Sequence, residues 1–567
     1  MNRQLPLGAA LFLTVACSGA SVPLAGGATT SSSTSVGRVM VMVAQVEPTT
    51  ISSKVLQTTG GLAIGATQRL FNATLTTSNG RGLPIPYLVD ALPELNTDTW
   101  KIFPDGRMET TYHLRAGLVW QDGAPLTSDD VVFSWKLLSH PEIGEAKSRP
   151  QVFMQEAVAT DPQTVVIRWA RPFRDAAEIG NDFPPFPKHI LGDALDTQPE
   201  QISSRPFWTS EYVGLGPFKL SRWEPGAFIE ASAFDKHVTG RAKIDRIKIL
   251  FSPDANTALA YLLAGEAHVS LDDAIRFEQG LVLERAWKPN KGGTVLSFPD
   301  QWRRNEIQHR PEYASPAAIL DVRVRKALSH TVDKDALNQL DFEGEGLLTE
   351  SVIPPTMDYF SVVDAAAVKY PFDPRKAEEL MNQAGFGKDS QGFYSSPTEG
   401  RFTWEIKTNA GAQSEDEVAF LSDAWRRAGF DFHVAVNPAA LSRDGEVRAA
   451  FPTMFGGGGP VGEDALVRFV SSEIPTPNNR WIGQNRGGYS SPEFDRLAAV
   501  FNAEVNRAAR GPEIAELVHA ITDQVGAMSL YFNPGILAHI SAIKGPQVAA
   551  PGAARDWNVQ DWEWTSN

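Results

Sequence analysis

The stretch from Asp105 to Leu138 reads DGRMETTYHLRAGLVWQDGAPLTSDDVVFSWKLL. Side chains at the even positions of residues 108–114 point one way and those at the odd positions the other, and this period of two predicts a half-buried strand. Residues 115–117 form a turn, residues 118–120 are expected to form a second short strand, and Asp122-Gly123 turns the chain again.

A helix is expected after these turns. The hydroxyl of Thr127 can accept from the backbone N–H of Asp130, and the carboxylates of Asp129 and Asp130 suit the positive end of a helix. The apolar stripe of this helix is predicted to consist of Val131, Val132, Trp135 and Leu138. Physical chemistry alone therefore predicts a strand–strand–helix unit of an α/β domain, and nothing catalytic.

The order of these residues closely resembles the signature of the family 5 extracellular solute-binding proteins, the oligopeptide, dipeptide and nickel type. In that family a strand ending in HLR is followed by an aromatic residue, then DG, then a capped helix. Other family-like segments are EPTT at 47–50, GLGPFKL at 214–220, Gly265-Glu266 and DVRVRKAL at 321–328. The resemblance runs, with gaps, from about residue 39 to residue 545.

Composition fits a large globular protein. The 567 residues are 42% hydrophobic and 21% charged, which allows substantial cores and several domains. The formal net charge is −15, which disfavours nucleic acid or an anionic membrane surface as a partner, because both reward basic patches.

The N-terminus has the pattern of an export signal. Arg3 precedes an apolar run from Leu5 to Ala16, too short to span a membrane as a mature helix. Cys17, the only cysteine, ends this run, and residues 13–17 resemble a lipoprotein box in which that cysteine is lipidated; the alternative is ordinary cleavage nearby, for example after Ala20. We expect a signal peptide at 1–17, a disordered tether at 18–37, and a protein in the periplasm or on the outer face of the cell membrane.

The resemblance implies a two-lobed α/β periplasmic-binding-protein fold, type II and cluster C-like, with an extra satellite domain on the first lobe. The expected domains are lobe I at 38–71, 206–296 and 531–567, the satellite at 72–205, and lobe II at 297–530.

Local patterns predict the main elements. Strands are expected at 39–46, 164–169, 244–251, 294–298 and 402–407, at 430–436 and at 530–532, with 294–298 and 530–532 crossing between the lobes. Helices are expected at 60–71, at 252–265 with Asp254 or Asn256 as the cap, at 320–328, from Asp373-Pro374 to Gly385, after a Ser414–Glu417 capping box, from Ser491-Pro492, and at 512–525. The strand–helix–strand order near 402–436 predicts a parallel βαβ unit.

No catalytic motif is present. The chain has no HExxH, CxxC, GxSxG or glycine loop ending in GK[ST]. Its ten histidines are dispersed, and adjacent acids such as Asp272-Asp273 are more typical of solvated loops or helix caps than of acid–base couples. We therefore predict no enzyme, no catalytic residues, no metal site and no cofactor.

Two stretches are candidates for the ligand site, residues 299–305 after the first crossing strand and residues 454–489. The candidate ligand-binding residues are Trp302, Arg303, Phe455, Gly456, Gly457, Asp464, Arg480, Trp481, Asn485 and Arg486. In peptide-binding members of the family, an aspartate shortly after the aromatic–glycine pair holds the ligand's ammonium group. Here Gly458, Gly459 and Pro460 occupy that neighbourhood, and the first acids are Glu463 and Asp464.

Arg480 and Arg486, with Trp481 and Asn485, can hold an anionic or sugar-like ligand through forked hydrogen bonds and stacking. Equally, Trp481 and Tyr489 can pack the lobe while the arginines are solvated. Glycines 456–459 either bring backbone close to the ligand or form a flexible loop.

By resemblance, the protein is expected to be the substrate-binding subunit of an ABC importer, which captures a small solute between its lobes and delivers it to membrane permease subunits. The family default is a peptide or peptide-like solute, with an oligosaccharide or a metal chelate as alternatives. We expect a monomer, no nucleic acid, and membrane contact only through the lipid anchor. The alternative functions are a secreted hydrolase on the same fold and a ligand sensor.

Overall fold

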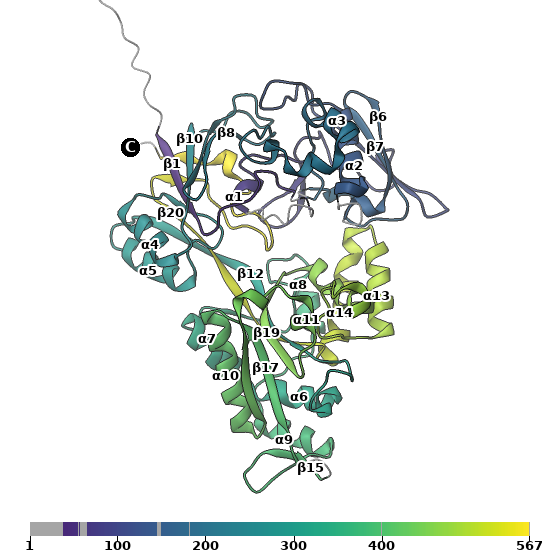
Figure 1. Cartoon of the computed structure of the whole chain (residues 1–567), viewed down its shortest axis with the longest axis vertical. Coiled ribbons are helices and arrows are strands. Elements are labelled where there is room, and N and C mark those ends of the chain that lie inside the picture. Colours follow the sequence, from purple (N-terminus) through teal and green to yellow (C-terminus); the bar gives the residue numbers. More distant parts are fainter. Residues whose placement is uncertain are drawn as a thin grey trace, which may run out of the picture. The chain divides into compact units, whose positions relative to one another are not determined.

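The largest sheet in the described part of the chain has eleven strands (Figure 1). Its spatial order is β18 (Asp431–Asn437), β17 (Thr403–Asn409), β19 (Met454–Gly459), β12 (Gly293–Ile307), β20 (Ala527–Ile540), β11 (Val269–Ser270), β1 (Val39–Ala44), β10 (Arg246–Phe251), β9 (Phe228–Ala233) and β8 (Phe218–Glu224), while β13 (Leu347–Leu348) pairs with β20. We call the part built on β1 and β8–β11 the first lobe and the part built on β17–β19 the second lobe.

The computed structural model describes residues 38–54, 56, 65–143, 149–180, 182–397 and 400–565. The predicted signal peptide, the tether and Cys17 lie outside the described residues. The helix predicted at 60–71 lies partly outside them, and its described part is α1 (Gly65–Gln68).

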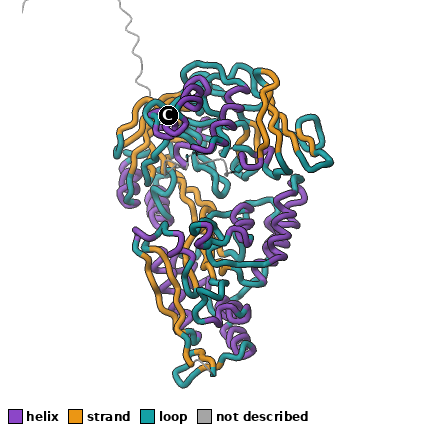
Figure 2. Tube along the Cα trace, turned by 45° about the vertical axis from the view of Figure 1, so that its right-hand side comes forward, coloured by secondary structure: helices purple, strands orange, loops and turns teal. Residues whose placement is uncertain are grey.

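Two long antiparallel strands, β12 and β20, connect the two lobes (Figures 1 and 2). They pair with each other from Gly293↔Ile540 to Glu306↔Ala527, and the register shifts twice, between Pro299 and Gln301 and between Arg303 and Arg304. The crossing strands predicted at 294–298 and 530–532 were therefore correct in place but too short. Residues 299–305, predicted to follow a strand, are part of β12.

The first lobe is organised around β1, which is parallel to both β10 and β11. Its mainly buried VMVMVA sequence confirms the predicted strand, although β1 ends two residues before the predicted limit. Helix α4 (Ala255–Ala264) has Asp254 as its cap, since that carboxylate accepts from the backbone N–H of Thr257, and the left-handed Gly265 ends it. Core side chains of β1 lie in one cluster with Trp562 from the C-terminal segment.

The 105–138 stretch forms β5 (Met108–His113) and α2 (Ser128–Ser139). The alternating burial of β5 confirms its predicted faces. It belongs to a four-stranded sheet in the order β4 (Trp100–Ile102), β5, β7 (Thr164–Trp169) and β6 (Met154–Asp161). Two details of the prediction were wrong. Residues 118–120 make only an isolated bridge, from Val119 to Pro125. Val132 and Trp135 are only partly buried, because the covered face of α2 runs through Val131, Phe133, Ser134, Leu137 and Leu138. Thr127 caps α2 as predicted, and the carboxylate of Asp130 in turn accepts from the backbone N–H of Thr127 at 2.9 Å.

The second lobe contains the predicted parallel unit β17–α10–β18. Helix α10 (Ala412–Ala428) begins earlier than predicted, and Glu415, not Glu417, accepts from the N–H of its cap residue Gly411. The predicted capping box was therefore wrong, and Glu417 is a buried residue of the second helical turn. The glycines at 456–459 belong to strand β19, so they do not form a loop.

The second lobe contains most of the other helices. They include α6 (Val322–His330), α7 (Lys334–Phe342), α8 (Phe360–Ala366), α9 (Pro374–Gln383), α11 (Gly445–Ala449), α12 (Glu463–Leu466), α13 (Pro492–Ala503) and α14 (Arg507–Asp523). Asp373 and Ser491 cap α9 and α13 as predicted, whereas α14 starts five residues before the predicted Pro512. The other elements are α3 (Lys188–Thr197), α5 (Phe277–Trp287), β2 (Thr76–Ser78), β3 (Pro84–Pro86), β14 (Gly387–Lys388), β15 (Tyr394–Ser396), β16 (Gly400–Arg401), β21 (Ile543–Lys544) and β22 (Glu563–Trp564).

Candidate functional site

Two adjoining cavities lie along the crossing strand β12. The larger, of about 1220 Å³, is lined by Gln45 and Asp254 of the first lobe, by Asp300 and Gln301 of β12, and by Asp341 and the start of α10 in the second lobe. The smaller, of about 200 Å³, lies within the second lobe. Both cavities are lined by Ser414, so they meet at the first turn of α10.

The larger cavity is acidic. Its charged lining residues are Asp254, Asp273, Arg276, Glu278, Asp300, Asp341, Asp416 and Asp423. Asp273 and Asp300 are partly neutralised by Arg555, whose Nη2 lies 2.7 Å and 3.1 Å from their carboxylate oxygens. Burial, together with the nearby charge of Glu417, raises the pKa of Asp341 to about 6. A wall with this excess of carboxylates attracts a cationic group.

The smaller cavity is basic. It is lined by Arg303, Arg304, Arg448 and Arg486, and by the single carboxylate Glu306. Arg304 Nη2 lies 2.6 Å from Glu306 Oε1, and Arg486 Nη1 lies 3.8 Å from the same oxygen. Burial lowers the pKa of both Arg304 and Arg448, and the charge of Arg486 lowers it further in each case.

Several guanidinium N–H groups in this cavity have no hydrogen-bond acceptor. Among the described residues, Nε and Nη1 of Arg304 and Nε of Arg448 are buried polar atoms without a partner. Arg303 differs, because it is paired with the buried Glu417 and also donates to Ser414 Oγ at 3.1 Å. These nitrogens, like the Oε2 atom of Glu306, are enclosed by protein without a partner, so the charges of Arg304 and Arg448 are incompletely compensated.

The backbone of β12 and β19 explains how these arginines reach one cavity. Arg303 and Arg304 are successive residues of β12 and both line this cavity, beside the glycines of β19, with which β12 pairs in regular register from Trp302↔Gly459 to Ile307↔Met454. On β19, a Cβ at Gly459 would lie 2.0 Å from Arg304 Nη1, whereas a Cβ at Gly457 would meet nothing within 4 Å. Gly459 therefore leaves room for the guanidinium, and Gly457 faces open space.

Half of the predicted site residues gather at the smaller cavity, namely Arg303, Phe455, Gly456, Gly457 and Arg486. Trp302 lies beside it, 4% exposed, with its ring 4.6 Å from the guanidinium carbon of Arg304 and its Nε1 donating to Ser529 Oγ at 3.2 Å. The Trp302 ring therefore packs against the guanidinium group of Arg304. A role of these residues in ligand binding stays a prediction.

The other four lie away from the two cavities. Asp464 pairs with Arg174 and, at 3.4 Å, with Arg149. The buried side-chain amide of Asn485 donates to the carbonyls of Phe469, Val470 and Tyr489, which holds its loop together. Arg480 and Trp481 have left-handed backbones, with φ of 58° and 60°. Neither lines a cavity described here, and the Trp481 ring lies 6.2 Å from that of Tyr313. Their role in binding also stays a prediction.

Sequence reasoning included Arg304 in the candidate stretch 299–305 without singling it out, and it missed Glu306 and Arg448. A signal existed for the first two: Arg304 and Glu306 are two residues apart on a strand and so share a face. Thr408 and Asn409, which also line the smaller cavity, lie at the carboxyl end of the parallel strand β17, where ligands of α/β sheets commonly bind. Arg448 lies in the short helix α11, and nothing local in the sequence marks it.

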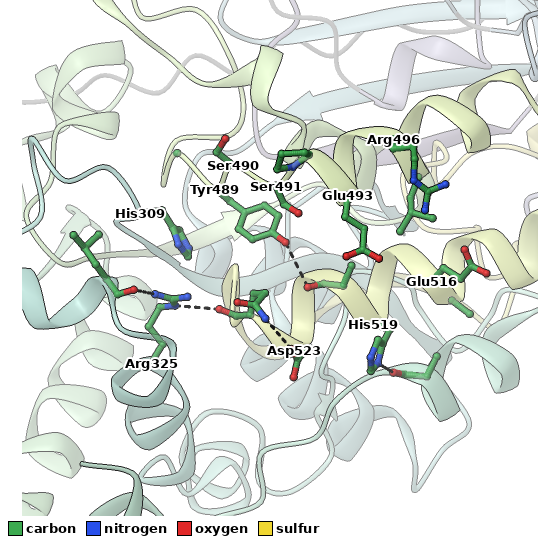
Figure 3. Close-up of a pocket in the computed structure, with 18 of the residues that line it drawn as sticks. His309, Arg325, Tyr489, Ser490, Ser491, Glu493, Arg496, Glu516, His519 and Asp523 are labelled. Atoms are coloured by element: carbon green, nitrogen blue, oxygen red, sulfur yellow. Dashed lines mark hydrogen bonds between the residues drawn. The ribbon is translucent and has the colours of Figure 1, made fainter. Parts of the chain in front are cut away.

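A further cavity, of about 1060 Å³, lies between α6, α13 and α14 (Figure 3). Its polar groups are largely satisfied internally. Arg325 donates to the carbonyls of Gln524, Ile319 and Leu320, and His519 Nδ1 lies 3.1 Å from the carbonyl oxygen of Ala366. It is therefore a weaker candidate than the pair of cavities along β12.

Within the described ranges, no helix is both long enough and apolar enough to cross a bilayer. In the same ranges, no three His, Cys, Asp or Glu side chains are grouped as a metal site would require.

Residues 91–474 match the sequence profile of the bacterial extracellular solute-binding proteins, family 5 Middle. The chain belongs to this family. Its members are solute-binding proteins, as the name of the family says. The match covers the signature stretch, β12 and the whole β17–β19 region.

Curated relatives of this family 5 chain include the dipeptide-binding protein of Escherichia coli K12, 28% identical over 326 residues, which are 53% of this chain and 56% of that protein. Another is the oligopeptide-binding protein AppA of Bacillus subtilis 168, 24% identical over 478 residues, 81% of each chain. The chain thus spans about half the length of the first curated relatives that it matches.

Among solved structures, NikZ from Campylobacter jejuni in complex with Ni(L-His) superimposes with a TM-score of 0.72 at 21% identity, covering 93% of this family 5 chain and 99% of NikZ. This likeness confirms the predicted fold class, the mixed α/β fold of the cluster C binding proteins.

Proposed function

We propose that the protein is the extracytoplasmic substrate-binding subunit of an ABC importer, which captures a small solute between its lobes and delivers it to membrane permease subunits. The observation that carries this proposal is the cavity of about 1220 Å³, lined from both lobes on either side of the crossing strands. A site of this kind closes on its ligand by a hinge motion of the lobes and releases it when they open.

The proposed solute is a peptide or a peptide-like molecule. The dipeptide-binding and oligopeptide-binding relatives favour this class. The acidic cavity favours it as well, because its carboxylates can hold a ligand ammonium group in place of the aspartate that the sequence lacks after Phe455-Gly456. An oligosaccharide and a metal chelate remain the alternative ligands.

Export and anchoring belong to the same proposal. The signal peptide at 1–17, lipidation of Cys17 and the tether at 18–37 would place the binding domain in the periplasm or on the outer face of the cell membrane. Lobe I at 38–71, 206–296 and 531–567, the satellite at 72–205 and lobe II at 297–530 are the proposed domains.

Native mass spectrometry of the gently purified protein, followed by thermal-shift screening, tests this function. The panel contains di- and tripeptides, oligosaccharides and metal chelates. We expect a co-purified small molecule, or a saturable rise of Tm with one class, since a ligand that binds only the folded state stabilises it by mass action. Asp341→Asn should weaken the response to a cationic solute, while the exposed Asp235→Asn should not. Turnover of an ester or glycoside without saturable binding would contradict the proposal.

A further inference from the structure

The smaller cavity has more positive charge than its surroundings compensate. Arg304, Arg448 and Arg486 face one carboxylate, Glu306, because the fourth arginine, Arg303, is already paired with Glu417. Arg304 is 7% exposed, and its charge is therefore largely removed from water. Uncompensated buried charge is unfavourable, so the arrangement is incomplete without an anion.

The guanidinium groups that line the cavity fit an oxyanion by charge. Glu306 accepts from only one end of the Arg304 fork, and Nε and Nη1 of Arg304 remain without an acceptor in the described structure. Arg448 Nε is buried and unpartnered in the same way. Planar guanidiniums with free N–H groups match the two or three oxygens of a carboxylate or phosphate group.

The position of the cavity links it to the solute site. It adjoins the acidic cavity at Ser414, in the first turn of the 17-residue helix α10, whose N-terminal end also favours negative charge. A solute lying along β12 would meet carboxylates at one end and guanidiniums at the other.

We infer that Arg304, Arg448 and Arg486 form an oxyanion subsite, which binds a carboxylate or phosphate group of a dipolar solute whose cationic end lies in the acidic cavity. This inference rests on the proposed function and specifies the chemical class of its solute. Arg304 supplies the central positive charge, and it is held by Glu306 and stacked on Trp302. Arg448 and Arg486 supply the flanking charges.

Thermal unfolding with inorganic phosphate as the probe tests the subsite without a known solute. At constant ionic strength set with sodium chloride, phosphate should raise the Tm of the wild type. Arg448→Gln should abolish this rise, and it should raise the Tm without phosphate because it relieves repulsion between like charges. The matched control is Arg443→Gln, which removes an exposed arginine five residues earlier and should behave like the wild type.

An equal response to phosphate in the three proteins would be a general salt effect and would overturn the subsite. No response in the wild type would overturn it as well. Arg486→Gln provides a second variant, with the same expected loss as Arg448→Gln.

Binding of dipeptides then separates this inference from the proposed function. Dipeptides with a free carboxylate should bind about tenfold or more tightly than the same peptides with a C-terminal amide, and Arg448→Gln should erase most of the difference. If phosphorylated solutes bind and free peptides do not, the oxyanion is a phosphate group and the subsite stands. If neutral and anionic solutes bind equally to the wild type and to Arg448→Gln, the subsite is wrong while the solute-binding function stands. If no solute binds but the phosphate response is present, the function fails and the subsite stands.

Discussion

Arg303 on β12 and Glu417 on α10 form a two-point ion pair inside the second lobe, in which Nε of Arg303 lies 2.9 Å from Oε1 of Glu417. Both side chains are almost fully buried, and Tyr531 of the other crossing strand donates to the same carboxylate. The pair therefore joins β12, β20 and α10 at the point where the two cavities meet. It also explains why the charge of Arg303 is compensated, whereas two guanidinium nitrogens of Arg304 have no acceptor in the described structure.

Removing one member of this pair should strongly destabilise the second lobe. Glu417→Ala leaves the guanidinium of Arg303 buried without a counter-charge, and we expect a loss of about 3–5 kcal/mol in the free energy of unfolding. Urea denaturation followed by tryptophan fluorescence measures it. Asp423→Asn on the same helix, which breaks the exposed pair with Arg427, is the control and should change stability by less than about 1 kcal/mol. A loss of similar size in both variants would contradict this interpretation.

A second ionic cluster connects residues 174–178 to the helices of the second lobe, and it should hold the unliganded lobes together. Arg174 donates to Asn502 and to Asp464, and Arg510 donates to the carbonyl of Arg174. Arg174→Ala should therefore increase the radius of gyration of the unliganded protein, measured by small-angle X-ray scattering.

The control for this cluster is Arg171→Ala, three residues away on the exposed surface, which should leave the radius of gyration unchanged. Saturating ligand should reduce the difference between Arg174→Ala and the wild type. An unchanged radius of gyration in Arg174→Ala would show that the cluster does not control the separation of the lobes.

His309 should make the protein less stable in acid. Burial lowers the pKa of His309 to about 3, and the charge of Arg325 contributes to this shift. The pKa of a histidine in the unfolded state is about 6.5. The unfolded state therefore binds more protons between these values, so this contribution to stability is present above pH 6.5 and is lost as the pH falls, by up to about 1.4 kcal/mol per unit.

His309→Gln should flatten the dependence of the free energy of unfolding on pH between about 4 and 6.5, as determined by denaturant titrations. His113→Gln, which replaces an exposed histidine of β5, should keep the wild-type slope. A wild-type slope in His309→Gln would mean that other groups cause the acid sensitivity.

Glycines of β19 should tolerate a methyl group unequally. Gly459→Ala would place Cβ 2.0 Å from the Arg304 guanidinium, which is confined by Glu306 and Trp302, so we expect a loss of about 1–3 kcal/mol. Gly457→Ala meets nothing within 4 Å and should change stability by no more than about 0.5 kcal/mol. Thermal denaturation of both variants measures the difference, and equal stability would show that Arg304 can move aside freely.

Local periodicity and caps allowed most element positions to be predicted, whereas the family and the fold class were predicted from the resemblance of motifs such as residues 105–138. Asp254, Asp373 and Ser491 cap their helices as their spacing predicted. The site was predicted less completely. Residues 299–305 were predicted to follow a strand, because Pro299 and the charged residues after it are not typical of a strand interior. In the structure, β12 continues through them with two register shifts.

Arg448 and Glu417 could not be assigned from local sequence. Arg448 is distant from Arg304 in the sequence. It lines the smaller cavity only because α11 lies directly before β19 in the chain. Glu417 fitted a capping pattern, and its pairing with Arg303 depends on the packing of α10 against β12. Charge compensation between distant segments is a tertiary property, and no local pattern encodes it.

The continuous pairing of β12 with β20 limits how the molecule can move. Two separate linkers would let the lobes slide, swivel and part in many directions. A double-stranded ribbon held by a ladder of backbone hydrogen bonds resists shear and stretching but can still twist and bend where its register is interrupted, near Pro299 and Arg303. The two lobes are therefore expected to approach and part by bending of this ribbon, without sliding past each other.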